Sequence, residues 1–468
     1  MVDGTTSRSQ SHAEGNNQKD TNSAIISSEI NLPCGIVVQN RLVKVAMYEH
    51  LSPLGGGVPN TYHLSLYSTW ARGKWGIIIT GNVQVSPSHL GLGGDLVIPP
   101  LGKPYDIEPW SRLSAAMHAC PIGEQPSLAL MQLCHVGRQS PRFIGGRRLW
   151  DSPLAPSSKR VGENVPESIL SRLLYWILFQ TPNEMEERDI DHAVDQYRHG
   201  AALAMNAGFD GVQLHGSHGY LITQFMSPKT NTRSDQYSKP LLFLYRIASQ
   251  IRKQVPKKFV LSVKLNAADY VEGGMTEEEG LRHVEEITRW DLFDIIEISG
   301  GDYENPEFIS SGSKRQAFFL HFAQKASLMV EKVASELTIS PPAILLTGSL
   351  RGQASIASVL HKNEASLIGI ARPAVVLPSY PRFLMDESLP PEAIPTPFEP
   401  TLPKLRVSKL AGASVNTMWY CYEMKRLAGF TLQGSTLEYR PSKAPALWRV
   451  LICYLSALWL LIVGSLGL

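Results

Sequence analysis

The sequence predicts an α/β protein that folds as a (β/α)8 TIM barrel with a C-terminal transmembrane helix. Between residues 36 and 380, apolar strand-like runs alternate with helical stretches. Several runs are apolar throughout, as expected for strands that are buried on both faces. Eight such runs with helices between them fit a closed barrel. The transmembrane helix is predicted from an uncharged apolar run at the end of the chain.

The predicted elements follow one another along this region. The expected strands are Val43–Met47, Gly76–Val85, Ser127–His135, Gly211–His215, Phe259–Asn266, Phe293–Ser299, Ala343–Thr347 and Leu367–Ile370. The expected helices are Tyr62–Lys74, Ile190–Ala207, Pro240–Gln254, Glu277–Trp290, Ala317–Leu337 and Gly352–His361. A doubly wound open sheet is the alternative fold, but no G-x-G-x-x-G motif follows any of the strands.

The chain divides into further parts around the barrel domain, which we place at residues 29–388. Residues 1–28 are polar and lack the apolar core of a signal peptide, so we expect a disordered N-terminus. Residues 389–446 start with a proline-rich linker and continue as an accessory helical segment. Within the barrel, Ser157–Glu187 interrupts the repeat with an apolar stretch, which we interpret as an excursion over the barrel mouth.

Residues 447–468 are predicted to be a tail anchor. The run VLICYLSALWLLIVGSLGL contains no charged residue and has no polar face to turn to water. At about 1.5 Å per residue it is long enough to cross a hydrocarbon core of about 30 Å. Basic residues precede it, which places the catalytic domain in the cytosol, with the endoplasmic reticulum as one candidate membrane. A buried C-terminal helix or a dimer contact is the alternative.

Composition excludes several other kinds of site. The net charge is only +2 and the basic residues form no block, which argues against nucleic acid as a partner. The five cysteines are scattered, so their spacing fits neither a disulfide framework nor a metal centre or iron–sulfur cluster.

Polar residues mark the same end of most predicted strands, where the chemistry of a barrel gathers. Gln132 and Lys264 lie within otherwise apolar runs, and His215 closes another. Strand ends adjoin polar loops in any fold, but a buried cation is costly unless it is paired or meets a ligand. This favours a bound anionic or electron-rich cofactor. The loops that follow the seventh and eighth strands, TGSLR and GIARP, are the usual phosphate site of such barrels.

These segments carry a resemblance to a known family. QLCHVGRQ, GFDGVQLHGSHGYLITQFMSPKTNTRSDQY, SVKLN, EISGG, LLTGS and GIARP together resemble the old yellow enzyme family of NAD(P)H:flavin oxidoreductases, over about residues 30 to 385. The resemblance implies a TIM barrel that holds FMN noncovalently. It also implies that NAD(P)H reduces the flavin, which then reduces the C=C bond of an α,β-unsaturated carbonyl compound, an enone or enal.

The resemblance also implies a role for each matching residue. His215 and His218 donate hydrogen bonds to the substrate carbonyl oxygen, and Tyr220 delivers a proton to the carbon next to it. Gln132 binds the flavin pyrimidine, and Lys264 lies beside the part of the ring that collects negative charge. The remaining cofactor residues line the ring (Ala46, Met47 and Asn82) or hold the phosphate (Gly348, Ser349, Ala371 and Arg372). Tyr48 and Cys134 depart from the family pattern, so their effect on the pocket stays open.

Other functions remain as alternatives. A His-x-x-His pair is also half of a metal site, but no third ligand at suitable spacing accompanies it. The flavin could instead serve a redox-neutral isomerisation of a conjugated enal or enone. A non-catalytic membrane-bound adaptor on a degenerate barrel is the alternative from another class. The sequence does not predict an oligomeric state.

Overall fold

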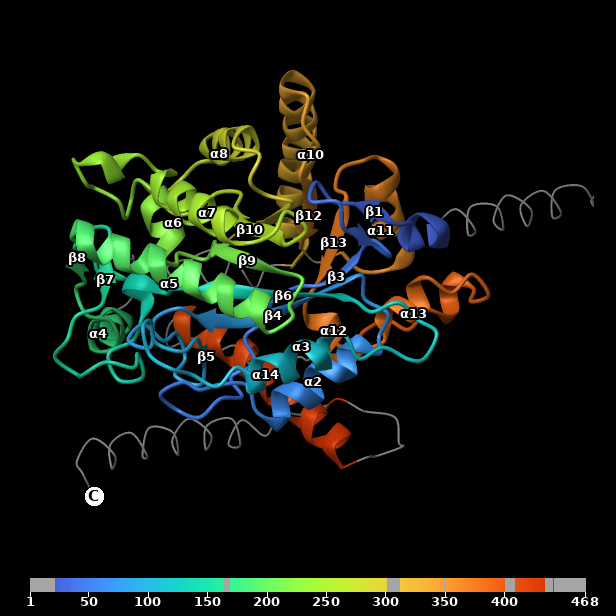
Figure 1. Ribbon diagram of the computed structural model, residues 1–468, viewed down its shortest axis with the longest axis horizontal. Helices are drawn as coiled ribbons and strands as arrows, with labels where there is room; N and C mark the ends of the chain where they lie inside the picture. The colour runs from blue at the N-terminus through green and yellow to red at the C-terminus, as the bar shows by residue number, and fades with distance from the viewer. Residues whose placement is uncertain are drawn as a thin grey trace, which may run out of the picture.

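A closed ring of parallel strands forms the centre of the computed structural model, which describes residues 22–163, 169–300, 312–348, 350–399, 409–433 and 441. The strands of the ring are β3 (Leu42–Lys44), β4 (Ile77–Gln84), β6 (Leu128–Cys134), β9 (Gly211–Gly216), β10 (Val260–Asn266), β11 (Ile295–Ser299), β12 (Ala343–Thr347) and β13 (Leu367–Ile370). Each pairs in parallel with the next, and β3 also pairs with β4, which closes the barrel (Figure 1). The predicted barrel and its eight strands are confirmed.

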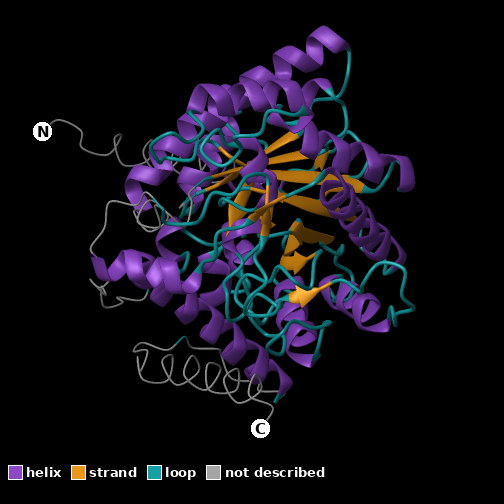
Figure 2. Ribbon diagram, turned by 90° about the vertical axis from the view of Figure 1, so that its left-hand side faces the viewer, coloured by secondary structure: helices purple, strands orange, loops and turns teal. Residues whose placement is uncertain are grey.

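Helices surround the ring, as the view in Figure 2 shows. The six predicted helices correspond to α2 (Thr61–Ala71), α5 (Glu187–Asn206), α7 (Leu242–Gln254), α8 (Glu277–Arg289), α10 (Gly312–Leu337) and α11 (Gln353–His361). The sequence analysis missed α3 (Glu108–Met117), which lies between β4 and β6. This helix is short and has a proline in its first turn, where proline is tolerated although it reads as a loop signal.

Shorter elements complete the described chain. They are β1 (Ile30–Asn31), β2 (Val37–Val38), β5 (Leu96–Val97), η1 (Gly137–Gln139), β7 (Leu154–Ala155), α4 (Ile169–Leu178), β8 (Asn183–Glu184), α6 (Leu221–Met226), η2 (Gln236–Ser238), α12 (Arg372–Val376), α13 (Tyr380–Leu384), η3 (Pro391–Ala393) and α14 (Lys409–Leu432). The predicted excursion at residues 157–187 thus contains α4, and β7 pairs with β8 at its base.

The barrel interior has an apolar part and a polar part, which follow one another along the strands. Branched apolar side chains from most of the strands, including Val43, Ile77 and Leu345, form one buried cluster together with residues of the β1–β2 hairpin. Further along the same strands, toward their carboxyl ends, the inward positions turn polar. The apolar part therefore supports a polar layer at the barrel mouth.

The segment after the barrel packs against it. The Ser65 hydroxyl in α2 donates to the carbonyl oxygen of Ala428 in α14 at 2.8 Å, and the Cys421 thiol donates to the backbone oxygen of Tyr48 at 3.1 Å. At the other end of the chain, residues 22–27 form a short helix whose Ile26 is fully buried. The prediction of disorder up to residue 28 is therefore wrong for this helix, whereas residues 1–21 lie outside the described residues.

No helix in the described part of the chain combines the length and the apolar character that a membrane span requires. The predicted anchor at residues 447–468 lies outside the residues that the structure describes.

Candidate active site

A chain of hydrogen bonds crosses the polar layer of the barrel. The Gln132 side-chain amide donates to the Gln213 oxygen at 2.8 Å, and the Gln213 amide donates to a Glu297 carboxylate oxygen at 2.9 Å. The second oxygen of Glu297 accepts a hydrogen bond from the Thr347 hydroxyl at 2.8 Å. Because these residues come from β6, β9, β11 and β12, the network holds half of the ring in register.

Lys264 is paired within the protein. Its ammonium nitrogen lies 3.0 Å from a carboxylate oxygen of Glu297, and the two side chains are 5% and 0% exposed. The two residues are direct partners in the register of β10 and β11. The sequence pattern indicated Lys264 but not Glu297. Because Glu297 balances its charge, the burial of this lysine does not by itself require an anionic ligand.

His215 and His218 converge, as the sequence predicts. Their facing ring nitrogens, Nε2 of His215 and Nδ1 of His218, are 3.4 Å apart. Burial, His218 and Lys264 hold the pKa of His215 well below its usual value, so this imidazole is neutral. Because its Nδ1 faces the backbone N–H of Ser217 at 3.4 Å, the proton belongs on Nε2. His215 therefore presents an N–H donor toward His218.

His218 has an unusual backbone that its neighbours hold in place. Its φ angle is 61°, in the left-handed region, which costs a non-glycine residue on the order of 1 kcal/mol. The Asn266 side-chain oxygen accepts from the His218 backbone N–H at 3.0 Å, and the Gln139 amide donates to its carbonyl oxygen at 3.0 Å. The Ser299 hydroxyl lies 3.2 Å from its Nε2. When the Ser299 hydroxyl donates to Nε2, the proton of a neutral His218 lies on Nδ1, and an oxygen placed beside both rings can then accept from each of them.

Tyr220 lies beside this pair. Its ring meets the His215 ring edge to face with centroids 4.7 Å apart. It is 4% exposed and packs with Cys134 and Val136 at the end of β6. The three predicted catalytic residues therefore share one small region at the mouth.

Asn82 faces the barrel interior because of a bulge in β4. The register with β6 shifts between Ile79 and Asn82, and Asn82 then pairs with Gln132. Without the extra residue the side-chain alternation would turn Asn82 outward. Gly81 fills the bulge, and its N–H donates to the buried Glu49 carboxylate at 2.9 Å. A side chain at Gly81 would collide with Glu49, so glycine is required there.

Comparison with known proteins identifies the group to which this site belongs. A profile of the NADH:flavin oxidoreductase / NADH oxidase family matches residues 34–388. The chain belongs to this family. Members are oxidoreductases that use a flavin, FMN, with NAD(P)H as the electron donor, as the sequence analysis predicts.

Relatives within the NADH:flavin oxidoreductase family cover most of the chain. An NADH-dependent flavin oxidoreductase of Hypocrea jecorina is 34% identical over 372 residues, which is 76% of this chain and 88% of that protein. One from Neonectria sp. is also 34% identical over 75% of this chain, but the match spans only 46% of that longer protein.

Solved structures share the fold. The old yellow enzyme homologue from Zymomonas mobilis aligns with a TM-score of 0.59 at 19% identity, over 78% of this chain and 93% of that one. A 2-naphthoyl-CoA reductase aligns with a TM-score of 0.66 at 20% identity, over 80% of this chain and 54% of that one.

The residues at the mouth fit the FMN of the flavin oxidoreductase family. The side-chain oxygen of Gln132 is buried and has no hydrogen-bond partner among the described residues. A buried amide oxygen without a donor is costly, and an N–H of the flavin pyrimidine would satisfy it. Lys264 adds a cation on β10, two residues before the end of that strand, with β9 between β10 and β6. Gln132 and Lys264 would therefore hold the ring.

The other predicted cofactor residues follow the ends of their strands. Ala46 and Met47 are the second and third residues after β3, Gly348 is the first after β12, and Ala371 and Arg372 are the first and second after β13. A side chain at Gly348 would press against Phe319 of α10 at 3.0 Å. Ser349 lies outside the described residues. The roles of these residues stay predictions.

Tyr48 and Cys134, which depart from the family pattern, meet a buried carboxyl that the sequence analysis missed. The Tyr48 hydroxyl donates to Asp95, and the Gln84 amide donates to the same oxygen at 2.8 Å. Asp95 is 1% exposed. Burial and Asp95 raise the pKa of Cys134 well above its usual value, so this cysteine is an unreactive thiol. The Tyr48 ring is thereby fixed at one wall of the mouth.

Asp95 should make stability depend on pH. Burial raises its pKa to about 7 from 3.8, so the native state binds a proton that the unfolded state has lost. The free energy of unfolding therefore falls as pH rises toward 7 and levels off above it. Between pH 5 and 8 we expect the free energy of unfolding of the wild type to fall by roughly 2–3 kcal/mol more than that of Asp95→Asn, as measured by urea denaturation at each pH. Asp151→Asn, at an exposed aspartate, is the control and should follow the wild type.

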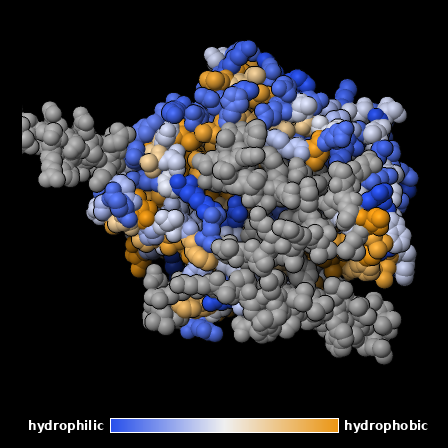
Figure 3. Space-filling model, turned by 180° about the vertical axis from the view of Figure 1, so that it is seen from behind, coloured by the Kyte–Doolittle hydropathy of each residue, from blue (hydrophilic) through white to orange (hydrophobic). Residues whose placement is uncertain are grey.

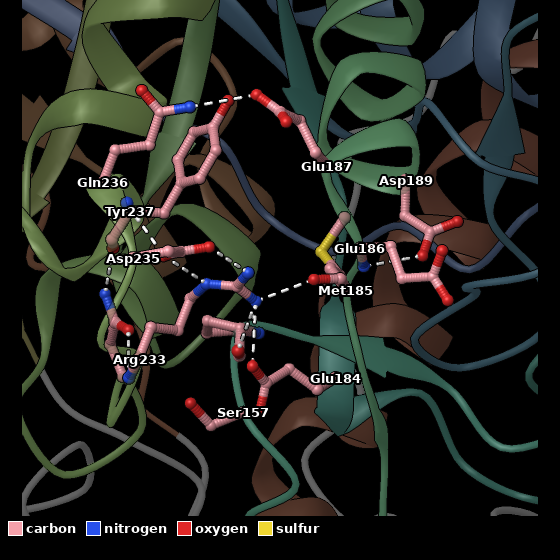
Figure 4. Close-up of polar contacts among 12 residues, drawn as sticks. Ser157, Glu184, Met185, Glu186, Glu187, Asp189, Arg233, Asp235, Gln236 and Tyr237 are labelled. Atoms are coloured by element: carbon pink, nitrogen blue, oxygen red, sulfur yellow. Dashed lines mark hydrogen bonds and ion pairs between the residues drawn. The ribbon is translucent and has the colours of Figure 1, made fainter.

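The polar run at residues 231–237 holds loops together. Figure 4 shows the Arg233 guanidinium between β8 and the loop that follows β7. It donates to the carbonyl oxygens of Met185 and Pro156 at 2.7 and 3.0 Å and lies 3.4 Å from Glu184. Asn231 bridges the backbone of Phe225 and Tyr237. These contacts fasten the base of the excursion to the segment that carries Tyr220.

Proposed function

We propose that the protein reduces the C=C bond of an α,β-unsaturated carbonyl compound with electrons from NAD(P)H. The observation that carries this proposal is the convergence of two imidazole ring nitrogens, 3.4 Å apart, beside the Tyr220 ring. When bound, FMN carries two electrons from NAD(P)H to the substrate.

The two histidines would hold the substrate carbonyl oxygen. An oxygen at normal hydrogen-bond distance from both nitrogens completes a triangle with them. Withdrawal of electron density into this oxygen makes the β carbon electrophilic. As the enolate forms, each preorganised donor contributes about 3–4 kcal/mol of stabilisation. A neutral His215 suits this role, because it donates a proton in a hydrogen bond without giving it up.

Tyr220 would protonate the α carbon. A phenol has a pKa of about 10 and is protonated at neutral pH, so it is available as an acid. Its ring contact with His215 fixes its position relative to the carbonyl donors. Prompt protonation of the α carbon completes the reduction and favours it over redox-neutral isomerisation.

Stoichiometry tests the proposal. Under anaerobic conditions, with enones and enals as substrates, we expect one NAD(P)H to be consumed for each saturated product. Isomerised product without NAD(P)H consumption would identify the redox-neutral alternative. Family membership favours an enzyme over the non-catalytic adaptor.

The location in the cell is part of the proposal. The uncharged run at residues 450–468 supports a single-pass tail anchor with the catalytic domain in the cytosol. Removal of residues 450–468 should shift the protein from the membrane pellet to the supernatant of a high-salt wash, with its specific activity retained. A truncated protein that stays in the pellet after a high-salt wash would contradict the anchor.

A further inference from the structure

Helix α4 has two apolar faces, and the described residues cover only one of them. Tyr175 and Phe179 are nearly buried and pack with Val161. On the opposite face Ile169, Leu173, Trp176 and Ile177 are 86%, 49%, 53% and 37% exposed. These four follow helical spacing, so they form one stripe. Large apolar side chains gathered on one surface usually mark a contact site.

The loop at residues 142–150 extends this stripe. The Arg142 N–H donates to the carbonyl oxygen of Leu178 at 2.8 Å, and the Gln180 amide donates to that of Leu149 at 3.1 Å. These bonds hold the loop beside the C-terminal end of α4. The loop adds three exposed apolar side chains, Phe143, Leu149 and Trp150, of which Trp150 is 75% exposed. Figure 3 shows apolar atoms at the right-hand edge of the molecule, at the height of α4.

The surface around the stripe carries an excess of positive charge, with one exposed carboxylate, Asp151, directly after Trp150. Segments 141–150 and 169–180 contain four arginines and no acidic residue. Arg148 and Arg172 are exposed, and the Arg142 guanidinium lies 5.9 Å from the centre of the Trp176 ring. We call this combination of α4 and the loop 142–150 the α4 surface.

The charge of the α4 surface favours an anionic lipid membrane over a second copy of the chain as its partner. In a twofold contact between copies of this chain through this surface, two patches of like charge would meet, which is unfavourable. A surface of tryptophan, leucine and isoleucine with arginines beside them is typical of segments that lie in the headgroup region of a bilayer. Anionic headgroups neutralise the arginines, while the apolar side chains reach the acyl chains.

We infer that the α4 surface docks peripherally on anionic phospholipid membranes, independently of residues 450–468. The surface belongs to the connection after β6, at the end of the barrel where the mouth lies. Gln139 of the same connection donates to His218 in the candidate site. Docking therefore brings the mouth toward the lipid surface, where apolar substrates concentrate.

Hydrogen–deuterium exchange on the full-length protein tests this inference locally. Backbone amides of residues 169–180 are compared without lipid, with phosphatidylcholine vesicles, and with vesicles that contain phosphatidylserine. We expect exchange in α4 to slow at least about threefold with the anionic vesicles only, and salt to reverse the effect. If residues 450–468 insert into the bilayer and the α4 surface does not dock, the exchange rates in α4 should stay unchanged.

Two pairs of substitutions separate the apolar and the charged contributions. Leu173→Ser with Trp176→Ser, and Arg148→Glu with Arg172→Glu, should each abolish the protection. Leu328→Ser with Lys332→Glu is the matched control on α10, where both side chains are similarly exposed, at 68% and 71%. It should behave as the wild type.

Three results would overturn the inference. They are no protection of α4 in wild-type protein with anionic vesicles, equal protection with neutral vesicles, or protection without lipid that grows with protein concentration. The last result would identify a second copy of the chain as the partner. None of them bears on alkene reduction, so the proposed function is tested separately.

Discussion

Tyr220→Phe should slow alkene reduction by a factor of about 10²–10⁴ while reduction of the flavin by NAD(P)H stays within about twofold of the wild-type rate. The phenylalanine ring keeps the contact with His215 and the packing against Cys134 and Val136, and the hydroxyl that donates the proton is lost. The flavin half-reaction needs no proton at the α carbon, so it should be spared. Anaerobic stopped-flow spectroscopy measures the two half-reactions separately.

Tyr237→Phe provides the matched control for this experiment. Tyr237 is also a buried tyrosine of the same segment, but its hydroxyl contacts Arg246 away from the histidine pair. Its substitution should leave both half-reactions close to the wild-type rates. An unchanged rate of alkene reduction in Tyr220→Phe would remove Tyr220 from its proposed role and point to water or another side chain as the acid.

The sequence predicted the barrel well because its strands are buried on both faces. Such strands appear as continuous apolar runs, and the bounds of β12 and β13 were predicted without error. The grouping of His215, His218 and Tyr220 could also be predicted. These residues are close in sequence, and the end of one strand with the turn that follows it brings them together. Helix α3 was missed because its apolar positions are few and a proline starts it.

Contacts between distant segments were harder to predict. Asp95 meets Tyr48 across 47 residues, and nothing in GLGGDLV indicates that its carboxyl is buried. Glu297 was predictable in principle. It lies inside the apolar run DIIEIS, two residues before the strand ends, as Lys264 does in SVKLN. A charge at the same place in two consecutive parallel strands predicts an ion pair, because neighbouring strands of the barrel are in register.

Glu297→Leu should lower the free energy of unfolding by about 3–5 kcal/mol. The substitution leaves the Lys264 ammonium buried without its counter-charge, and it removes the acceptor for Gln213 and Thr347. Urea denaturation of the protein stripped of FMN measures the effect. Glu336→Leu is the matched control, because Glu336 pairs with Arg289 at the surface and is 42% exposed. It should cost less than about 1 kcal/mol.

Combining Glu297→Leu with Lys264→Met separates the structural role of the pair from its role toward the cofactor. Removing both charges avoids the unpaired ion, so much of the lost stability should return. FMN affinity should not return, because the cation that we expect beside the ring is gone. A double variant that regains stability and still binds FMN as the wild type does would show that the Lys264–Glu297 pair serves the fold alone. If Glu297→Leu itself costs less than about 1 kcal/mol, the Lys264 charge is compensated by another group at the mouth.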